Sequence, residues 1–423
     1  MKRPIRTHPV YWRTLKTLPP SDWKDEEVGD YGEIIKGKLP KTLYSQPSEN
    51  TVPYLLIDSL NDGEPLYTDD LDLPMIDEDD TVVVADGSRS GLPIRGVSGA
   101  LGSTLLRYRA RDGFDKDFLF YLLESLYPFT NTATIGGAVP HLDKRLLSKL
   151  KLATPRKEEQ EAIGKILHAV DEGILQTKEE LEAARRLKTA LMQQLFTRGI
   201  PGKHRRFKKI KYGFIPENWD SPKLKEIAKI DSGITLNQDR NPRKNVFRYL
   251  TVVNVHRENI ILDEERYLEL WENEIPGRLL MEKDILVVEG HANSSEIGRA
   301  AMVGEECVGM AYQNHLFRVR VIHDEIDPYF LLFTLNSERV RRHWNAICNT
   351  SSGLNTINHR QLGNLVIPKP DPEEQGKIVE IVLTAKENIA AIEHKLKALG
   401  EVKKSLLQNL LTGKVRVNAG APA

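Results

Sequence analysis

The stretch PRKEEQEAIGKIL, residues 155–167, is the strongest indication of the fold. The chain contains a close copy of it 215 residues later, PDPEEQGKIVEIV, residues 370–382. The similarity continues along the chain, so that residues 155–197 align with residues 370–412. Apolar residues recur at steps of three and four in both copies, which is the period of an α-helix with a narrow apolar stripe. Each copy therefore predicts one helix of about 40 residues, roughly 60 Å long at 1.5 Å per residue.

The ends of the two expected helices carry recognisable signals. In the second copy Asp371 is the expected N-cap, Pro372 the first helical residue and Glu374 the partner of a capping box. Both copies end near glycine, in LMQQLFTRG and LLQNLLTGK. Helices so long and polar need a partner along the apolar stripe, and each copy is the obvious partner of the other. The stripe alone also fits a general coiled-coil dimerisation element.

The segments before the two helices also echo each other. Residues 20–40 match 216–236 through Trp23 and Trp219, and 79–91 match 283–298, a short apolar strand followed by a loop of small residues. Residues 115–125 and 326–338 predict a helix, and residues 147–155 and 362–370 predict a strand that leads into the long helix. The sequence therefore predicts an α+β fold, in which two mixed α/β domains are separated by two long antiparallel helices that form a coiled-coil spacer with a pseudo-twofold internal repeat. The expected segments are domain one (1–152), helix one (153–200), a basic linker (201–212), domain two (213–366), helix two (367–415) and a tail without order (416–423).

Composition excludes several classes of protein. The chain has no apolar run near 18 residues, and its basic N-terminal segment is not followed by the apolar stretch of a signal peptide. Its two cysteines, Cys307 and Cys348, have no metal-ligand spacing, which favours a reducing compartment, the cytoplasm. The formal net charge is zero, from 60 basic and 60 acidic residues, which argues mildly against a nucleic-acid partner. The charge is unevenly spread, however, because residues 58–86 are acidic and KHRRFKKIK, residues 203–211, is strongly basic.

Taken in order, these repeated marks resemble the specificity subunit of a type I restriction–modification enzyme. The marks are the motif GFIPENWDSPKLKEIAKIDSG (213–233), the two helix starts with P…EEQ, and the helix ends LFTRG and LLTG. The resemblance implies two target-recognition domains that each recognise one half of a split DNA sequence, held apart by the two helices. It also implies two modification subunits, which carry the S-adenosylmethionine chemistry, and two restriction subunits, which carry ATP-driven translocation and cleavage. The first domain departs from the pattern, since its opening motif is TLPPSDWKDEEVGDYGEI and its middle is acidic. The resemblance therefore does not define which surface of domain one contacts DNA.

Catalytic motifs are missing from the sequence. GEIIKGKL, residues 32–39, resembles a phosphate-binding loop, but Leu39 occupies the position where the magnesium-binding Ser or Thr is required. No amino-methyltransferase motif, glycine-rich cofactor motif or nuclease-like cluster is found. We therefore expect a non-catalytic chain that binds no metal, with S-adenosylmethionine, ATP and Mg²⁺ on its partner subunits.

Base recognition needs polar side chains on loops that reach base edges, together with phosphate contacts that set the register. The expected base-reading residues of domain one are Ser88, Arg89, Ser90, Arg95, Thr132, Thr134, His141 and Lys144. Those of domain two are His291, Asn293, Ser294, Ser295, Arg299, Gln313, Asn314, His315, Ser351, Ser352, Asn355 and Asn358. The expected phosphate contacts of the basic linker are Arg205, Arg206, Lys208 and Lys209.

Two other interpretations fit the same pattern. One is the recognition subunit of a related enzyme in which a single partner polypeptide carries both cleavage and methylation. The other is an interaction scaffold whose coiled coil joins proteins and whose globular domains bind peptides.

Overall fold

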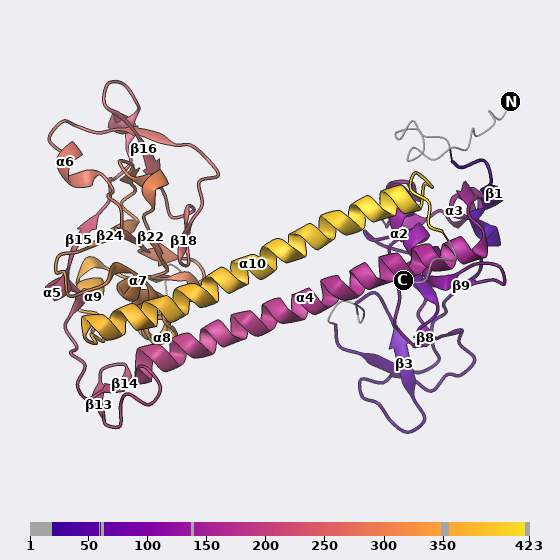
Figure 1. Ribbon diagram of the computed structural model, residues 1–423, viewed down its shortest axis with the longest axis horizontal. Coiled ribbons are helices and arrows are strands. Elements are labelled where there is room, and N and C mark those ends of the chain that lie inside the picture. Colours follow the sequence, from indigo (N-terminus) through magenta and orange to yellow (C-terminus); the bar gives the residue numbers. More distant parts are fainter. Residues whose placement is uncertain (1–18, 59, 61–62, 137–138, 348–354, 419–423) are drawn as a thin grey trace. The chain divides into compact units, whose positions relative to one another are not determined.

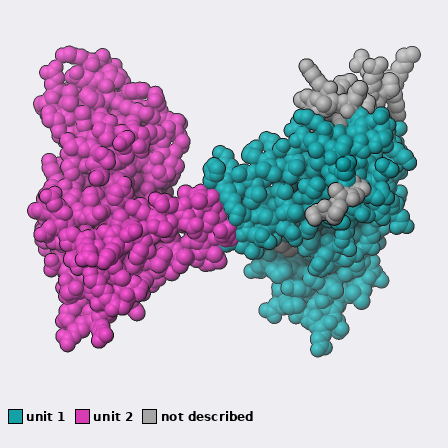
Figure 2. Space-filling view, viewed as in Figure 1, with its two compact units in different colours: residues 1–179, 393–423 teal, residues 180–392 magenta. Residues whose placement is uncertain are grey.

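The structure is a computed structural model of the 423-residue chain, and it describes residues 19–58, 60, 63–136, 139–347 and 355–418. The chain divides into two compact units, which Figure 2 shows in different colours. Unit 1 comprises Met1–Glu179 and Glu393–Ala423, and unit 2 comprises Glu180–Ile392. Each unit therefore contains one α/β domain and a part of each of two long helices (Figure 1).

Two four-stranded sheets form most of unit 1. The first has the order β2-β9-β6-β7 with antiparallel neighbours, and the second has the order β4-β3-β8-β5, in which β3 and β8 are parallel. Strand β6 has the sequence TVVV and is buried throughout, as expected for β-branched residues in a sheet interior. The strands are β1 (Lys24–Glu27), β2 (Gly32–Lys36), β3 (Val52–Leu55), β4 (Leu66–Thr68), β5 (Met75–Ile76), β6 (Thr81–Val84), β7 (Pro93–Ile94), β8 (Gly99–Leu101), β9 (Leu105–Ala110), β10 (Thr134–Ile135), β11 (His141–Leu142) and β12 (Lys151–Thr154). The helices that begin in this unit are η1 (Val28–Asp30), α2 (Lys116–Thr132), α3 (Lys144–Lys149) and α4 (Lys157–Arg198).

Unit 2 repeats this plan with longer connections. Its main sheet has the order β15-β24-β20-β22, and its second sheet, β19-β16-β23, again contains one parallel pair, β16 with β23. The strands are β13 (Phe207–Ile210), β14 (Gly213–Pro216), β15 (Ala228–Ser232), β16 (Val246–Leu250), β17 (Val255–His256), β18 (Asn259–Ile260), β19 (Tyr267–Glu269), β20 (Ile285–Val288), β21 (Gly290–His291), β22 (Ala300–Met302), β23 (Ala311–Tyr312), β24 (Leu316–Val321) and β25 (Asn355–Thr356). The helices are α5 (Leu224–Ile227), η3 (Gln238–Arg240), α6 (Ile275–Arg278), η4 (Ser294–Glu296), η5 (Glu305–Cys307), α7 (Pro328–Asn336), α8 (Glu338–Ile347), α9 (His359–Gly363) and α10 (Pro372–Leu410).

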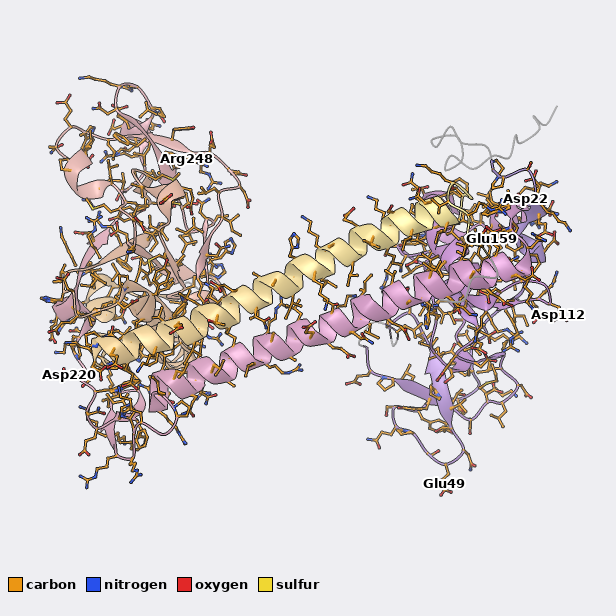
Figure 3. All side chains as sticks on the ribbon, in the orientation of Figure 1. Asp22, Glu49, Asp112, Glu159, Asp220 and Arg248 are labelled. Atoms are coloured by element: carbon orange, nitrogen blue, oxygen red, sulfur yellow. The ribbon has the colours of Figure 1, made fainter. Side chains whose placement is uncertain are left out.

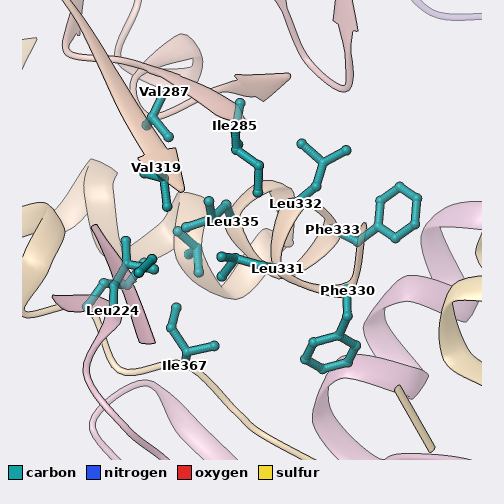
Figure 4. Packing of buried hydrophobic residues seen from close by; sticks show 14 of the residues in the cluster. Leu224, Ile285, Val287, Val319, Phe330, Leu331, Leu332, Phe333, Leu335 and Ile367 are labelled. Carbon is teal, nitrogen blue, oxygen red and sulfur yellow. The ribbon is translucent and has the colours of Figure 1, made fainter. Parts of the chain in front are cut away.

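The core of unit 2 surrounds α7, which is buried along most of its length. Figure 4 shows its residues Leu331, Phe330 and Leu335 among side chains from strands β20 and β24. The corresponding helix of unit 1, α2, is buried in the same way, with Phe118 and Tyr121 in the largest core of that unit. The helices expected at 115–125 and 326–338 are thus present, each as the central element of a core.

The two long helices are present as expected, with 42 residues in α4 and 39 in α10. In unit 1, Ile163 near the start of α4 and Leu410 at the end of α10 belong to one hydrophobic core. In unit 2, Leu195 near the end of α4 and Ile378 near the start of α10 belong to one core. Each unit therefore combines the beginning of one long helix with the end of the other.

Three expectations of local structure are wrong. Residues 362–370 form no strand but only isolated bridges, of Lys223 with Val366 and of Asp220 with Lys369. Pro368 and Pro370 lack the amide hydrogen that a continuous ladder requires, whereas the equivalent strand β12 pairs fully with β1. The basic linker (201–212) also contains a strand that was not expected, β13, which pairs with β14 in a hairpin.

The tail is the third expectation that fails, because its first residues are docked on unit 1. The Arg416 guanidinium forms ion pairs with Glu159 and Asp22, and Val417 packs against the hydrophobic core (Figure 3 labels both acids). Among the residues that the structure describes, no helix is both long and apolar enough to cross a membrane.

Candidate nucleic-acid interface

The repeated glutamine of the helix starts attaches each long helix to its domain. Gln160 accepts a hydrogen bond from the amide of Asp115, the N-cap of α2, at 3.0 Å, and donates to the carbonyl oxygen of Pro155 at 2.9 Å. Gln375 does the same with Asp327, the N-cap of α7, and with Pro370, both at 2.9 Å. Both glutamines are buried. The EEQ motif occurs twice because each domain needs the same attachment, between its central helix and the start of a long helix.

The glutamate before each glutamine holds the segment that follows the other long helix. Glu374 accepts hydrogen bonds from Nε2 of His204 at 2.7 Å and from the indole of Trp219 at 3.1 Å, and it pairs with Lys203 at 3.0 Å. Glu159 pairs with Arg416 at 2.8 Å. The expected capping box at Asp371 is therefore only half correct, because Asp371 caps the Glu374 amide at 2.8 Å while the Glu374 carboxylate points to the residues after α4.

Unit 2 carries one further link between its domain and both long helices. Glu258, at the turn between β17 and β18, pairs with Lys188 of α4 at 2.7 Å and with Lys386 of α10 at 3.1 Å. Its backbone has φ 63°, a left-handed conformation that disfavours a glutamate. In unit 1 the two helices are joined directly, by Lys403 and Asp171 at 2.8 Å.

Three loops expected to recognise DNA in domain two converge in the structure. Strand β21 pairs with β25, so that His291 lies opposite Asn355. Glu289 connects these strands to the third loop, because its amide donates to the carbonyl oxygen of His315 and its carboxylate binds Nδ1 of His315 at 2.9 Å. The amide of Ile357 in turn donates to the carbonyl oxygen of Glu289 at 2.9 Å. Glu289 was missed by the sequence analysis, and only its place directly after the apolar strand 285–288 could have indicated it.

The exposure of the expected residues in domain two is uneven. Asn293 and His315 are exposed, and those partly exposed are His291, Ser294, Ser295, Gln313 and Asn314. Arg299 is buried, where its guanidinium donates to the carbonyl oxygen of Val252 at 2.9 Å and pairs with Glu296, so the structure uses it internally. Asn355 lies in β25, and the expected residues Ser351 and Ser352 lie outside the described residues.

Asn358 has a structural role that its exposure does not reveal. Its side chain accepts from the amide of Gln361, and the Gln361 side chain accepts from the amide of Asn358, each at 2.8 Å, which forms a capping box at the start of α9. Asp143 caps α3 of domain one in the same place. The spacing Asn-x-x-Gln is a sequence signal for such a cap, and it would have separated this asparagine from the other loop residues.

Two of the expected loops of domain one converge in the same manner. Asp86 forms a β-bridge with His141, and the amide of Leu142 donates to the carbonyl oxygen of Ala85 at 2.8 Å. Asp86 follows β6 as Gly290 follows β20, so the same loop pairing occurs in both domains. Ser88, Thr132 and His141 are exposed, and Arg89, Thr134 and Lys144 are partly exposed.

Two of the residues expected to contact DNA in domain one instead form hydrogen bonds and ion pairs within the unit. The Ser90 side chain is buried and its hydroxyl donates to the carbonyl oxygen of Gly87 at 2.7 Å, so it closes the loop. The Arg95 guanidinium binds Asp117 of α2 at 3.1 Å and Asp171 of α4 at 3.4 Å, and it lies over the Phe120 ring. Arg95 therefore joins the domain to the long helix, and its side chain is committed to this network.

A cluster of charges surrounds Asp86 where the two loops of domain one meet. Nδ1 of His141 lies 2.7 Å and Nζ of Lys36 3.6 Å from the Asp86 carboxylate. Burial lowers the pKa of the Lys144 ammonium, and nearby Lys36 lowers it further while Asp86 opposes both. Lys36 was missed because it lies on β2, far before both loops in the sequence, and the sheet brings it here.

The basic linker presents its cations on strand β13 and on the two residues before it. Arg205, Arg206 and Lys209 are exposed and Lys208 is partly exposed. Within the described residues, none of the four forms an ion pair, whereas their neighbours Lys203 and His204 are held by Glu374. A surface with unpaired cations is the arrangement that binds phosphates in a salt-dependent way.

The geometry described so far is matched by known proteins. Residues 20–184 and 216–401 each match the model of the type I restriction modification DNA specificity domain. The chain belongs to this family. It is 30% identical over 407 residues to the Type I restriction enzyme MjaVIII specificity subunit of Methanocaldococcus jannaschii, covering 94% of each chain.

Solved structures share the fold of this family member. The S subunit of a type I restriction–modification system from M. genitalium has a TM-score of 0.57 at 15% identity, over 93% of this chain and 99% of that one. A second chain, solved in a study of complex assembly and conformational transition of the type I R-M system, has a TM-score of 0.59 at 16% identity, over 94% and 100%. The function of this family member is DNA target recognition as a specificity subunit of a type I restriction–modification system.

Proposed function

We propose that this specificity subunit recognises a split DNA target, with one half-site bound by each domain and the helices α4 and α10 acting as an antiparallel coiled-coil spacer with pseudo-twofold symmetry. The observation that carries the proposal is the double occurrence of one arrangement. Each unit has the same order of strands in its main sheet, the same loop pairing after the buried strand, and the same glutamine link to a long helix. Two equivalent recognition surfaces on one chain suit a target with two halves.

The base contacts of the proposal come from the loops that meet in each domain. In domain two they are Asn293, Ser294, Gln313, Asn314 and His315, which are at least partly exposed. In domain one they are Ser88, Arg89, His141 and Lys144, together with Lys36. We assign Ser90, Arg95, Arg299 and Asn358 to the support of these loops, because their side chains are used within the fold.

The remaining functions belong to partner subunits in this proposal. The chain is non-catalytic and acts in the cytoplasm, and it assembles with two modification subunits and two restriction subunits. S-adenosylmethionine, ATP and Mg²⁺ bind to those partners. We place the two domains at 1–152 and 213–366, and the spacer segments, which contain α4 and α10, at 153–200 and 367–415.

A matched insertion tests the spacer. Four residues, or one helical turn, are added after Ala183 in α4 and after Ala390 in α10. Both points lie between the ion pairs of Asp171 with Lys403 and those of Glu258 with the two helices, so both links are retained. One turn adds about 6 Å to the helices. Since one base pair spans about 3.4 Å, the gap between the half-sites should grow by at most about two base pairs.

The measurement is a genome-wide map of methylated sites in host cells that express the variant with its partner subunits. The expected result is an unchanged sequence in both half-sites with a longer gap. A variant with the same four residues inserted after Asp263, in an exposed loop, should keep the original gap. A change in the bases of either half-site with the gap unaltered would refute the spacer role.

A further inference from the structure

A cavity of about 830 Å³ opens in unit 2, at the end of α4. It is enclosed by three elements, namely the last turns of α4, the hairpin β13–β14 and helix α8. Its apolar walls include Phe196 of α4 and the hairpin residues Phe207 and Phe214. Phe207 and Phe214 are 41% and 58% exposed, which is high for phenylalanine. The cavity is not part of the proposed base-reading surface.

The charged groups that line the cavity are mostly cations. Arg198, Lys211, Arg339 and Arg342 face a single acid, Glu338. Glu338 is already paired with Arg342 at 2.5 Å, one turn along α8. Among the described residues, the other three cations form no ion pair. The cavity therefore concentrates positive charge in a chain whose formal net charge is zero.

The Arg339 guanidinium is the most telling of these groups. One of its nitrogens, Nη2, donates to the carbonyl oxygen of Phe214 at 2.6 Å, but Nη1 is buried and has no acceptor in the described part of the chain. Burial also lowers the pKa of this guanidinium. A buried donor without an acceptor costs about 1–3 kcal/mol, and more when the group is charged. An anionic oxygen at this position would remove that cost.

The His343 and Tyr212 rings add uncharged walls to the cavity beside its cations. The His343 ring packs against Tyr212, with 4.1 Å between ring centroids. Burial and the neighbouring Lys211 lower the pKa of His343 to about 4, so it is neutral at physiological pH. Apolar walls next to the cations reduce the local screening by water, which strengthens an Arg–phosphate or Arg–carboxylate pair.

The surroundings of the cavity favour a polyanion over an isolated carboxylate. The hairpin that forms one wall also carries Lys208 and Lys209, and Arg205 and Arg206 directly precede it; among the described residues none of the four forms an ion pair. Helix α8 lines the cavity and also contacts η4, and its Trp344 packs against Gly298, two residues after η4. Its ten residues span about 15 Å, so the cavity lies close to the base-reading loop that contains η4.

We propose that this cavity binds a backbone phosphate of duplex DNA that flanks the half-site of domain two, with Arg339, Arg342 and Lys211 as its ligands. This inference rests on the proposed function of the chain, and it adds a sequence-independent contact outside the recognition loops. Among the described residues of domain one, α2 is a single continuous helix where domain two has α7 and α8. The phosphate contact is thus confined to one side of the split target.

The test uses the double variant Lys211→Gln/Arg342→Gln in the full chain, purified with its modification subunits. Both side chains lie at the cavity rim and neither is buried, so folding should be retained. The control is Lys225→Gln/Lys244→Gln, which removes two exposed cations of unit 2 elsewhere. Binding to a duplex with the wild-type methylation motif is measured between about 50 and 200 mM salt.

The double variant should reduce the slope of log K against log[salt] by about 0.9, the value for one lost phosphate contact, and should keep the sequence preference. Protection of the backbone beside the half-site of domain two should disappear from a hydroxyl-radical footprint. If the wild-type complex fails to bind DNA specifically, the proposed function itself is wrong. If the wild type binds and the two double variants behave alike, only the cavity proposal is overturned. A double variant that loses a modification subunit while its salt slope is unchanged would instead assign the cavity to an acidic protein surface and would also overturn the proposal.

Discussion

Replacing Glu374 by glutamine should destabilise unit 2 more than any exposed charge substitution in the same helix. The carboxylate of Glu374 is fully buried and accepts from His204 at 2.7 Å, from Trp219 at 3.1 Å and from the amide of Ile200 at 3.3 Å, and it pairs with Lys203. Glutamine removes the negative charge and one acceptor oxygen, so the neighbouring cation and imidazole lose their partner.

The size of the effect follows from these contacts. Breaking a buried ion pair costs about 3–5 kcal/mol, and hydrogen bonds to a charged group are worth about 1.5–3 kcal/mol each without being additive. Glutamine keeps one acceptor, so we expect a loss of about 2–4 kcal/mol. For a unit of roughly 200 residues this corresponds to a decrease in Tm of about 5–10 °C. Tryptophan fluorescence is a suitable probe because the Trp219 indole contacts the substituted group.

The loss should also depend on pH. Burial alone would raise the pKa of Glu374, but hydrogen bonds from His204 and Lys203 outweigh it and hold the pKa below the ordinary value of 4.5. A lowered pKa in the folded state contributes stability above the unfolded value, and this contribution is lost as the pH falls through the folded pKa. The difference in Tm between wild type and variant should therefore be full near pH 7 and should shrink below about pH 4.5.

The neighbouring substitution Glu373→Gln is the matched control. Glu373 carries the same charge one residue earlier, but its side chain is 77% exposed, and among the described residues it forms an ion pair only with Lys377 along the helix. Little change in Tm is expected for this control. If Glu374→Gln lowers Tm no more than Glu373→Gln does, or if its effect grows as the pH falls to 4, the buried-partner reasoning fails.

Two further substitutions test the other links of the helices. Glu258→Gln should leave Lys188 and Lys386 without their acidic partner. The free energy of unfolding of unit 2, measured in urea, should therefore fall by about 1–2 kcal/mol. Adding Lys188→Met should recover part of this loss. A double variant no more stable than the single one would contradict this. Arg416→Ala should destabilise unit 1 by about 1–2 kcal/mol, because buried Glu159 loses its cation, and unchanged thermal unfolding would show that the docked tail is dispensable.

The positions of the expected DNA-binding residues show where sequence reasoning stops. It pointed to loops that the structure brings together in each domain, and in each domain one of them follows a buried apolar strand. It did not separate residues that are exposed, such as Asn293, from residues whose side chains bond within the domain, such as Ser90 and Arg95. Both kinds have the same composition and the same loop context. Which side of a loop a polar group faces depends on partners that are distant in sequence.

The sequence by itself determined the duplicated organisation, because helical periodicity, helix-start motifs and buried strands are local signals that appear twice in the same order. Helices α4 and α10 begin and end within a few residues of the expected positions. Tertiary structure alone decided which partners the repeated motif meets. Glu159 and Glu374 occupy the same place in the motif, yet one binds Arg416 of the tail and the other binds His204 of the linker. Long-range packing makes these choices, since a buried carboxylate needs a cation from whichever segment the fold brings beside it.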